Sequence, residues 1–154
     1  MSQAVIPMHG YVLAVAAAVL WGLLYVLDER LLAGISIYRL YFLHSIAGVA
    51  VAGAVLLARG ESPASLLRFS FPGVSLPLVL ATMAVVVLAC LAIFSSIQAL
   101  GASRAAVLEI SYPLFVAIFA WLLYRQPIQW PVIVGGIFIF IGSAIIVGWS
   151  AHEG

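Results

Sequence analysis

The chain has 154 residues, of which 66% are hydrophobic and only 7% are charged, whereas a soluble domain carries about 25% charged residues. Six basic and five acidic side chains are too few to cover a surface that faces water. The net charge of +1 comes without a basic cluster, so the phosphate contacts that nucleic-acid binding needs are missing. Composition therefore favours a membrane protein and excludes a protein that binds DNA or RNA.

Five apolar segments follow one another along the chain, each long enough to cross a bilayer. A hydrocarbon core of about 30 Å needs roughly 20 helical residues at a rise of about 1.5 Å per residue. The segments are apolar on every face and too long for barrel strands, so we expect helices. The sequence predicts an all-α, multi-pass fold in one domain over residues 1–154, a bundle of five transmembrane helices at about 10–27, 35–58, 76–99, 105–123 and 131–149.

The first span carries Trp21 and Tyr25 one helical turn apart, which places two aromatic side chains on one side of the helix. Residues 1–10 contain no Lys or Arg, so the positive segment of a signal peptide is missing and we expect the span to stay in the mature protein. The charged triplet that begins at Asp28 predicts a short polar turn after the span. In the fifth span, Gly135 and Gly142 lie one heptad apart and predict a stripe of close helix packing.

Glu109 is the one acidic residue that lies well inside a span, about five residues into the fourth. A carboxyl group in hydrocarbon is costly unless it is paired or hydrated, and burial favours its neutral form. Glu109 is therefore a candidate group for binding a proton or a substrate. The alternative is a structural acid that is stabilised by the helix N-terminus and bonded to a nearby serine.

Two residues that follow Glu109 support its prediction as a proton- or substrate-binding group. Pro113 has no N–H group, so the carbonyl of Glu109 loses its normal helical donor, and Pro113 becomes a candidate hinge. Tyr112 adds a hydroxyl group close by.

Other polar side chains lie at a similar depth in the neighbouring spans. His44 in the second span and Ser95 near the end of the third lie toward the same half of the membrane as Glu109. This predicts a polar vestibule on the side of the first and third loops, although a hydrogen bond to a serine would also explain His44. The candidate substrate- or proton-binding residues are Glu109, Tyr112, Trp21, Tyr25, Ser95 and His44.

Catalytic and metal-binding patterns are missing from the sequence. It contains no HExxH, no GxSxG and no paired aspartates, and the single cysteine, Cys90, offers neither a disulfide nor a thiolate site. We therefore expect no enzyme activity, no cofactor and no metal.

The six arginines are divided evenly between the two sides of the predicted bundle. Counting from the loops, one side holds Arg59, Arg68 and Arg125, and the other holds Arg30, Arg39 and Arg104. The positive-inside rule therefore favours neither orientation. We expect that the chain inserts both ways.

Several short stretches of the sequence form a recognisable pattern. They are the Trp21-Gly22 pair, Arg39 at the start of the second span, residues 99–106 and 112–117, and Gly135-Gly136 with Gly142. Together they resemble the five-span EamA-type repeat of the drug/metabolite transporter superfamily. Most members of that family join two inverted repeats and export small metabolites through a central cavity. The resemblance implies that Trp21, Tyr25, Ser95, Glu109 and Tyr112 face the cavity, with His44 on a more peripheral span.

The chain departs from the family pattern in two ways. Where the family has a Gly-Glu pair after the fourth span, this sequence reads Tyr124-Arg125-Gln126-Pro127. Only one repeat is present, and a single repeat cannot enclose a two-fold cavity, so the resemblance implies a dimer. The balanced arginines are what an antiparallel homodimer requires.

These observations predict a multi-pass transporter in the cell inner (plasma) membrane. We expect it to move small metabolites or drugs by alternating access as a homodimer within the lipid bilayer, with proton coupling if Glu109 titrates. The alternative is a non-transporting membrane scaffold or accessory subunit, which would need close helix packing but no buried carboxyl group.

Overall fold

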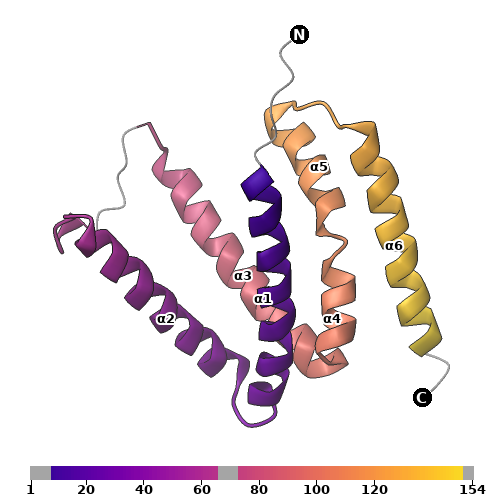
Figure 1. The fold of residues 1–154 in the computed structure, drawn as a ribbon, viewed down its shortest axis with the longest axis horizontal. Coiled ribbons are helices and arrows are strands. Elements are labelled where there is room, and N and C mark those ends of the chain that lie inside the picture. The colour runs from indigo at the N-terminus through magenta and orange to yellow at the C-terminus, as the bar shows by residue number, and fades with distance from the viewer. Residues whose placement is uncertain (1–7, 66–72, 151–154) are drawn as a thin grey trace. The chain divides into compact units, whose positions relative to one another are not determined.

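The computed structural model describes residues 8–65 and 73–150. These residues confirm an all-α fold and form the α-helices shown in Figure 1, which are α1 (Met8–Leu32), α2 (Ile37–Ala58), α3 (Leu76–Leu100), α4 (Ala102–Glu109), α5 (Tyr112–Tyr124) and α6 (Trp130–Ser150).

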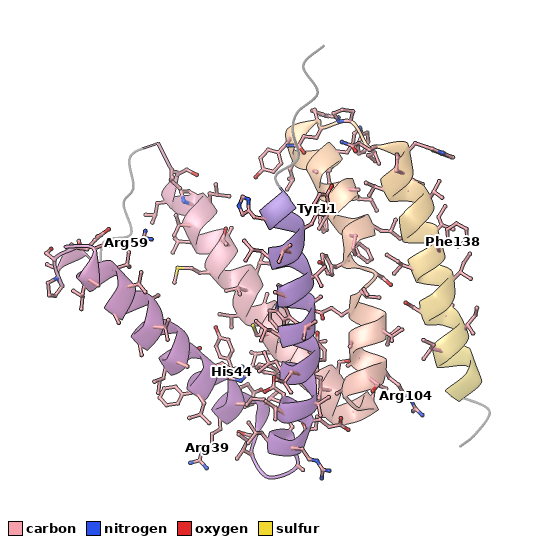
Figure 2. The ribbon with its side chains drawn as sticks, viewed as in Figure 1. Tyr11, Arg39, His44, Arg59, Arg104 and Phe138 are labelled. Carbon is pink, nitrogen blue, oxygen red and sulfur yellow. The ribbon has the colours of Figure 1, made fainter. Side chains whose placement is uncertain are left out.

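Four helical stretches are long and apolar enough to cross a membrane. They are His9–Leu32, Ile37–Ala58, Leu76–Leu100 and Ala102–Tyr124, and they correspond to the first four expected spans. In α6 the described apolar stretch, Trp130–Ile146, is shorter. Side chains along these helices are widely exposed, and Phe138 on α6 points outward with 71% of its surface free (Figure 2). Apolar surface of this extent needs lipid or a protein partner as its surroundings.

The first span ends later than the sequence predicts. Helix α1 does not turn at Asp28 but continues to Leu32, and Asp28 is only 2% exposed. The helix ends at the following Ala33-Gly34 turn, where the N–H group of Gly34 donates to the carbonyl of Leu31 at 2.9 Å. The expected polar turn is therefore wrong, because Glu29 and Arg30 are good helix formers and α1 continues through them to the turn that follows Leu32.

The fourth span is interrupted, whereas the sequence predicts one continuous helix at 105–123. Helix α4 begins at Ala102 and ends at Glu109, and α5 begins at Tyr112, so Ile110 and Ser111 lie outside both helices. The break precedes Pro113, which cannot donate to the carbonyl four residues earlier. It places irregular backbone directly after Glu109.

The chain divides into two compact units. The first unit comprises Met1–Glu29 and Ile97–Gly154, and the second comprises Arg30–Ser96. The first unit holds most of α1 together with α4, α5 and α6. The second unit holds α2 and most of α3, and Arg39 and Arg59 lie at opposite ends of α2 (Figure 2).

Helix α6 packs against both α4 and α5 within the first unit. The buried hydroxyl group of Ser143 lies 2.8 Å from the carbonyl oxygen of Val107 on α4 and donates to it. A Cβ atom added at Gly136 would overlap the side chain of Leu114 on α5. Gly136 is therefore the glycine at the contact between α5 and α6. A Cβ atom added at Gly135 or at Gly142 would have no neighbouring atom within 4 Å. The packing stripe that the sequence predicts at Gly135 and Gly142 is therefore not where α5 meets α6.

Candidate functional site

A pocket of about 540 Å³ opens in the first unit beside α1 and the break between α4 and α5. Its volume lies within the range of roughly 300–1,000 Å³ that is usual for small-molecule sites. Four of the six candidate residues from the sequence meet in it. The lining residues are Ala18, Trp21, Gly22 and Tyr25 from α1, and Ala106, Glu109, Ile110 and Tyr112 from the α4–α5 segment.

The helical period explains why α1 supplies one half of the pocket. Ala18, Gly22 and Tyr25 recur at intervals of three or four residues, so they share one face of the helix. The small residues leave room, and the aromatic ones form walls. The ring of Trp21 meets that of Tyr25 edge to face, with ring centres 6.3 Å apart and an angle of 68° between the planes.

Tyr25 holds the carboxylate of Glu109 in place. The Tyr25 hydroxyl group donates a hydrogen bond to Oε2 of Glu109. Tyr25 is 5% exposed, whereas Trp21 and Tyr112 are 57% and 59% exposed, so the pocket has a buried floor and an open rim. Glu109 itself is exposed to the pocket. An oriented carboxylate between aromatic rings is suited to bind a cationic group.

The broken backbone changes the hydrogen bonding beside Glu109. The N–H group of Ser111 donates to Leu108 at 3.3 Å, and that of Leu114 donates to Ser111 at 3.2 Å, both over three residues instead of four. Within residues 8–65 and 73–150, no donor is found for the carbonyl oxygens of Glu109 and Ile110. The pocket is therefore lined by two residues with free backbone acceptors in addition to the carboxylate.

Glu29 is a contributor that the sequence does not reveal. Its Oε2 accepts a hydrogen bond from the N–H group of Ala102 at 3.1 Å, so α1 caps the first turn of α4. Gly101 makes this possible, because its φ of 83° suits glycine and an added Cβ would lie 3.3 Å from Oε1 of Glu29. The four-residue spacing from Tyr25 to Glu29 is the only signal in the sequence, and it does not identify a backbone partner.

His44 and Ser95 lie in the second unit. The ring of His44 meets that of Phe94 edge to face at 5.5 Å and 74°. The hydroxyl group of Ser95 donates to the carbonyl of Leu91 in its own helix at 2.7 Å. Their part in the site stays a prediction.

A second pocket, of about 390 Å³, lies between α5 and the start of α6, and Tyr112 and Pro113 line part of it. Among the residues that the structure describes, no group of three or more His, Cys, Asp or Glu side chains is arranged to hold a metal ion. Of these two pockets, the one lined by Glu109, here called the carboxylate pocket, is the one whose lining includes an acidic side chain.

A family model described as "EamA-like transporter family" matches residues 8–148, which include every residue of the carboxylate pocket. The comparison with curated proteins and the comparison with solved structures find no match to the chain.

Proposed function

The chain belongs to the EamA-like transporter family, and we propose that it carries small cationic or zwitterionic solutes across the cell inner membrane by alternating access. The observation that carries this proposal is the carboxylate pocket, which Glu109 lines together with Trp21, Tyr25 and Tyr112. Family membership accounts for transport, and the pocket chemistry supports the choice of solute.

The bond between Tyr25 and Glu109 suggests how a solute enters. An arriving cation replaces the Tyr25 hydroxyl group as the partner of the carboxylate and gains a stronger, charge-assisted interaction. The aromatic rings add cation–π attraction to the same charge. Glu109 can hold a proton or a solute cation but not both at full strength, and this competition would couple solute movement to protons.

An antiparallel homodimer would complete the pocket. Trp21 and Tyr112 form an exposed rim, and a carboxylate that faces hydrocarbon is costly. A second copy inserted in the opposite orientation would cover this rim and reproduce the inverted repeats of two-repeat transporters. Arginines at both ends of the helices support such a pair, with Arg104 near the start of α4 and Arg125 at the end of α5.

The interruption between α4 and α5 supports alternating access. Discontinuous helices in transporters place irregular backbone at the binding site and let the two helical halves move separately. Here the irregular residues are Ile110 and Ser111, directly after Glu109. Pro113 keeps the segment from closing into one helix and is the proposed hinge.

Flux measurements in proteoliposomes test this function. The purified chain is reconstituted and offered a panel of cationic, zwitterionic, neutral and anionic metabolites, with and without a proton gradient. We expect saturable flux of cationic or zwitterionic members, accelerated by a proton gradient of opposite direction. Flux no greater than in protein-free vesicles for the whole panel would contradict transport and favour a scaffold. Flux restricted to anionic members would contradict the proposed solute class.

A further inference from the structure

We infer that the carboxylate pocket prefers cationic groups that carry N–H donors, so that a primary ammonium group binds more tightly than a quaternary ammonium group. This inference rests on the proposed function and narrows its substrate class. It follows from the number and kind of acceptors that the α4–α5 break leaves beside Glu109.

The first acceptor is the carbonyl oxygen of Glu109. In a continuous helix this oxygen accepts a hydrogen bond from the N–H group of residue 113. Residue 113 is a proline and has none. No other donor to this oxygen is found among residues 8–65 and 73–150.

The second acceptor is the carbonyl oxygen of Ile110. Its regular donor would be the N–H group of Leu114, which instead donates to Ser111 at 3.2 Å. The described part of the chain offers this oxygen no replacement. Glu109 and Ile110 both line the pocket, so both acceptors belong to residues that a solute contacts.

The carbonyl oxygen of Val107, which is not among the pocket-lining residues, also loses its regular helical donor but has a replacement. Its regular donor is the N–H group of Ser111, which is diverted to Leu108. The hydroxyl group of Ser143 on α6 lies 2.8 Å from this oxygen and 2.9 Å from the carbonyl oxygen of Ile139, so its one proton is shared between the two and supplies Val107 with a donor. The fold therefore satisfies the acceptor that the break frees toward α6 and leaves those of the pocket-lining residues for another donor.

A primary ammonium group supplies the donors that are missing. It carries a positive charge for the Glu109 carboxylate and three N–H groups, enough for the carboxylate and for both carbonyl oxygens. A quaternary ammonium group has the same charge and keeps the cation–π attraction, but it has no N–H group. It would displace water from two backbone acceptors without offering them a replacement donor, which is costly. Sites built to form hydrogen bonds discriminate strongly against analogues that cannot form them.

A matched pair of probes tests the inference. The probes are 2-phenylethylammonium and its N,N,N-trimethyl derivative, which share charge and aromatic ring and differ in N–H groups. Their binding to the detergent-purified full chain is measured by titration calorimetry. We expect the primary ammonium probe to bind at least about tenfold more tightly, and we expect Glu109→Gln to weaken both probes.

A variant at Pro113 tests whether the preference for the primary ammonium probe depends on the interruption between α4 and α5. Pro113→Ala restores an N–H group that can pair with the carbonyl of Glu109, so the preference for the primary probe should fall severalfold while the trimethyl probe keeps its affinity. Pro127→Ala, which changes a proline in the loop between α5 and α6, is the matched control and should retain the wild-type preference. An unchanged preference in Pro113→Ala would overturn the role of the Glu109 carbonyl.

The remaining outcomes separate this inference from the proposed function. Equal affinity for the two probes, lost in Glu109→Gln, would overturn the inference and leave a cation-binding transporter in place. Tighter binding of the trimethyl probe would overturn it in the same way. If the folded wild-type chain bound neither probe, both the inference and the proposed cationic substrate class would be contradicted.

Discussion

Two hydrogen bonds from residues one turn apart tie α1 to α4 at different levels. The Tyr25 hydroxyl group donates to the Glu109 carboxylate at the end of α4, and the Glu29 carboxylate accepts from the Ala102 N–H group at its start. Both ends of α4 are thereby fixed against the same helix. The position of Glu109 in the pocket depends on Glu29 as well as on its own partner.

Gly101→Ala tests the contact between Glu29 and the start of α4, with Gly60→Ala as its control. Both glycines have a positive φ, 83° and 88°, so alanine should cost about 1–2 kcal/mol at either site. A Cβ atom added at Gly101 would lie 3.3 Å from Oε1 of Glu29, whereas one added at Gly60 would meet no atom within 4 Å. Gly101→Ala should therefore destabilise the protein further, because Glu29 must shift. Thermal unfolding in detergent measures this, and equal losses in the two variants would refute the contact.

The sequence identifies some of these residues and misses others for a physical reason. Glu109, Tyr25, Trp21 and Tyr112 stand out because polar or aromatic groups are conspicuous in apolar spans, and the structure places all four around one pocket. Glu29 does not stand out, because its partner is a backbone N–H group that any residue at that position could offer.

At the scale of elements, the stability of the first unit depends on how closely α6 packs against α4 and α5. Gly136 lies against Leu114 of α5, and Ser143 satisfies a carbonyl of α4. In a membrane, small residues and interhelical hydrogen bonds of this kind provide the association energy. The two contacts hold α6 to both sides of the break.

Gly136→Ala should disturb this packing, whereas Gly135→Ala should not. The added methyl group overlaps Leu114 at position 136 and meets no atom within 4 Å at position 135. Overpacking of this kind costs about 1–3 kcal/mol. Unfolding of the two variants in detergent and denaturant measures the difference. A stability for Gly136→Ala that matches Gly135→Ala would contradict the close approach of α5 and α6.

Hydropathy predicts the spans well but not where they are interrupted. Long apolar segments define α1, α2 and α3 because hydrocarbon forces continuous helices. The prediction of a polar turn at Asp28 is wrong, since the backbone continues to the glycine turn that follows Leu32. The break at Ile110 is marked in the sequence only by Pro113, and a proline alone does not show whether a helix bends or stops.

At the scale of the whole molecule, the positive-inside rule predicts orientation from the positions of the arginines. In the second unit, Arg39 lies in the first turn of α2 and Arg59 caps its end, and in the first unit Arg104 and Arg125 lie at opposite ends of the α4–α5 segment. Arg68, which enters the even count from the sequence, lies outside the described residues. The resemblance predicts the family from the sequence, and the family model confirms it. The antiparallel homodimer stays a proposal, because balanced arginines permit both orientations but do not identify the surfaces that two copies would share.

Added charge should separate the two proposed orientations. Ala33→Arg with Gly34→Arg adds basic residues on one side, and Gln126→Arg with Gln129→Arg adds them on the other, so the positive-inside rule should direct the variants oppositely. A reporter fused to the C-terminus measures orientation. We expect each double variant to lose transport when expressed alone and to regain it when the two are expressed together. Full activity of either variant alone would contradict the antiparallel pair.

Flux through proteoliposomes that contain Glu109→Gln tests most directly whether the carboxylate pocket is the transport site. The matched control is Glu61→Gln, which removes an exposed carboxylate that bonds Ser65 at 2.9 Å and lies outside the pocket. For the panel solute that wild-type protein carries fastest, flux should fall to the protein-free background in Glu109→Gln and stay at the wild-type rate in Glu61→Gln. Wild-type flux in a correctly folded Glu109→Gln variant would contradict a transport role for this pocket.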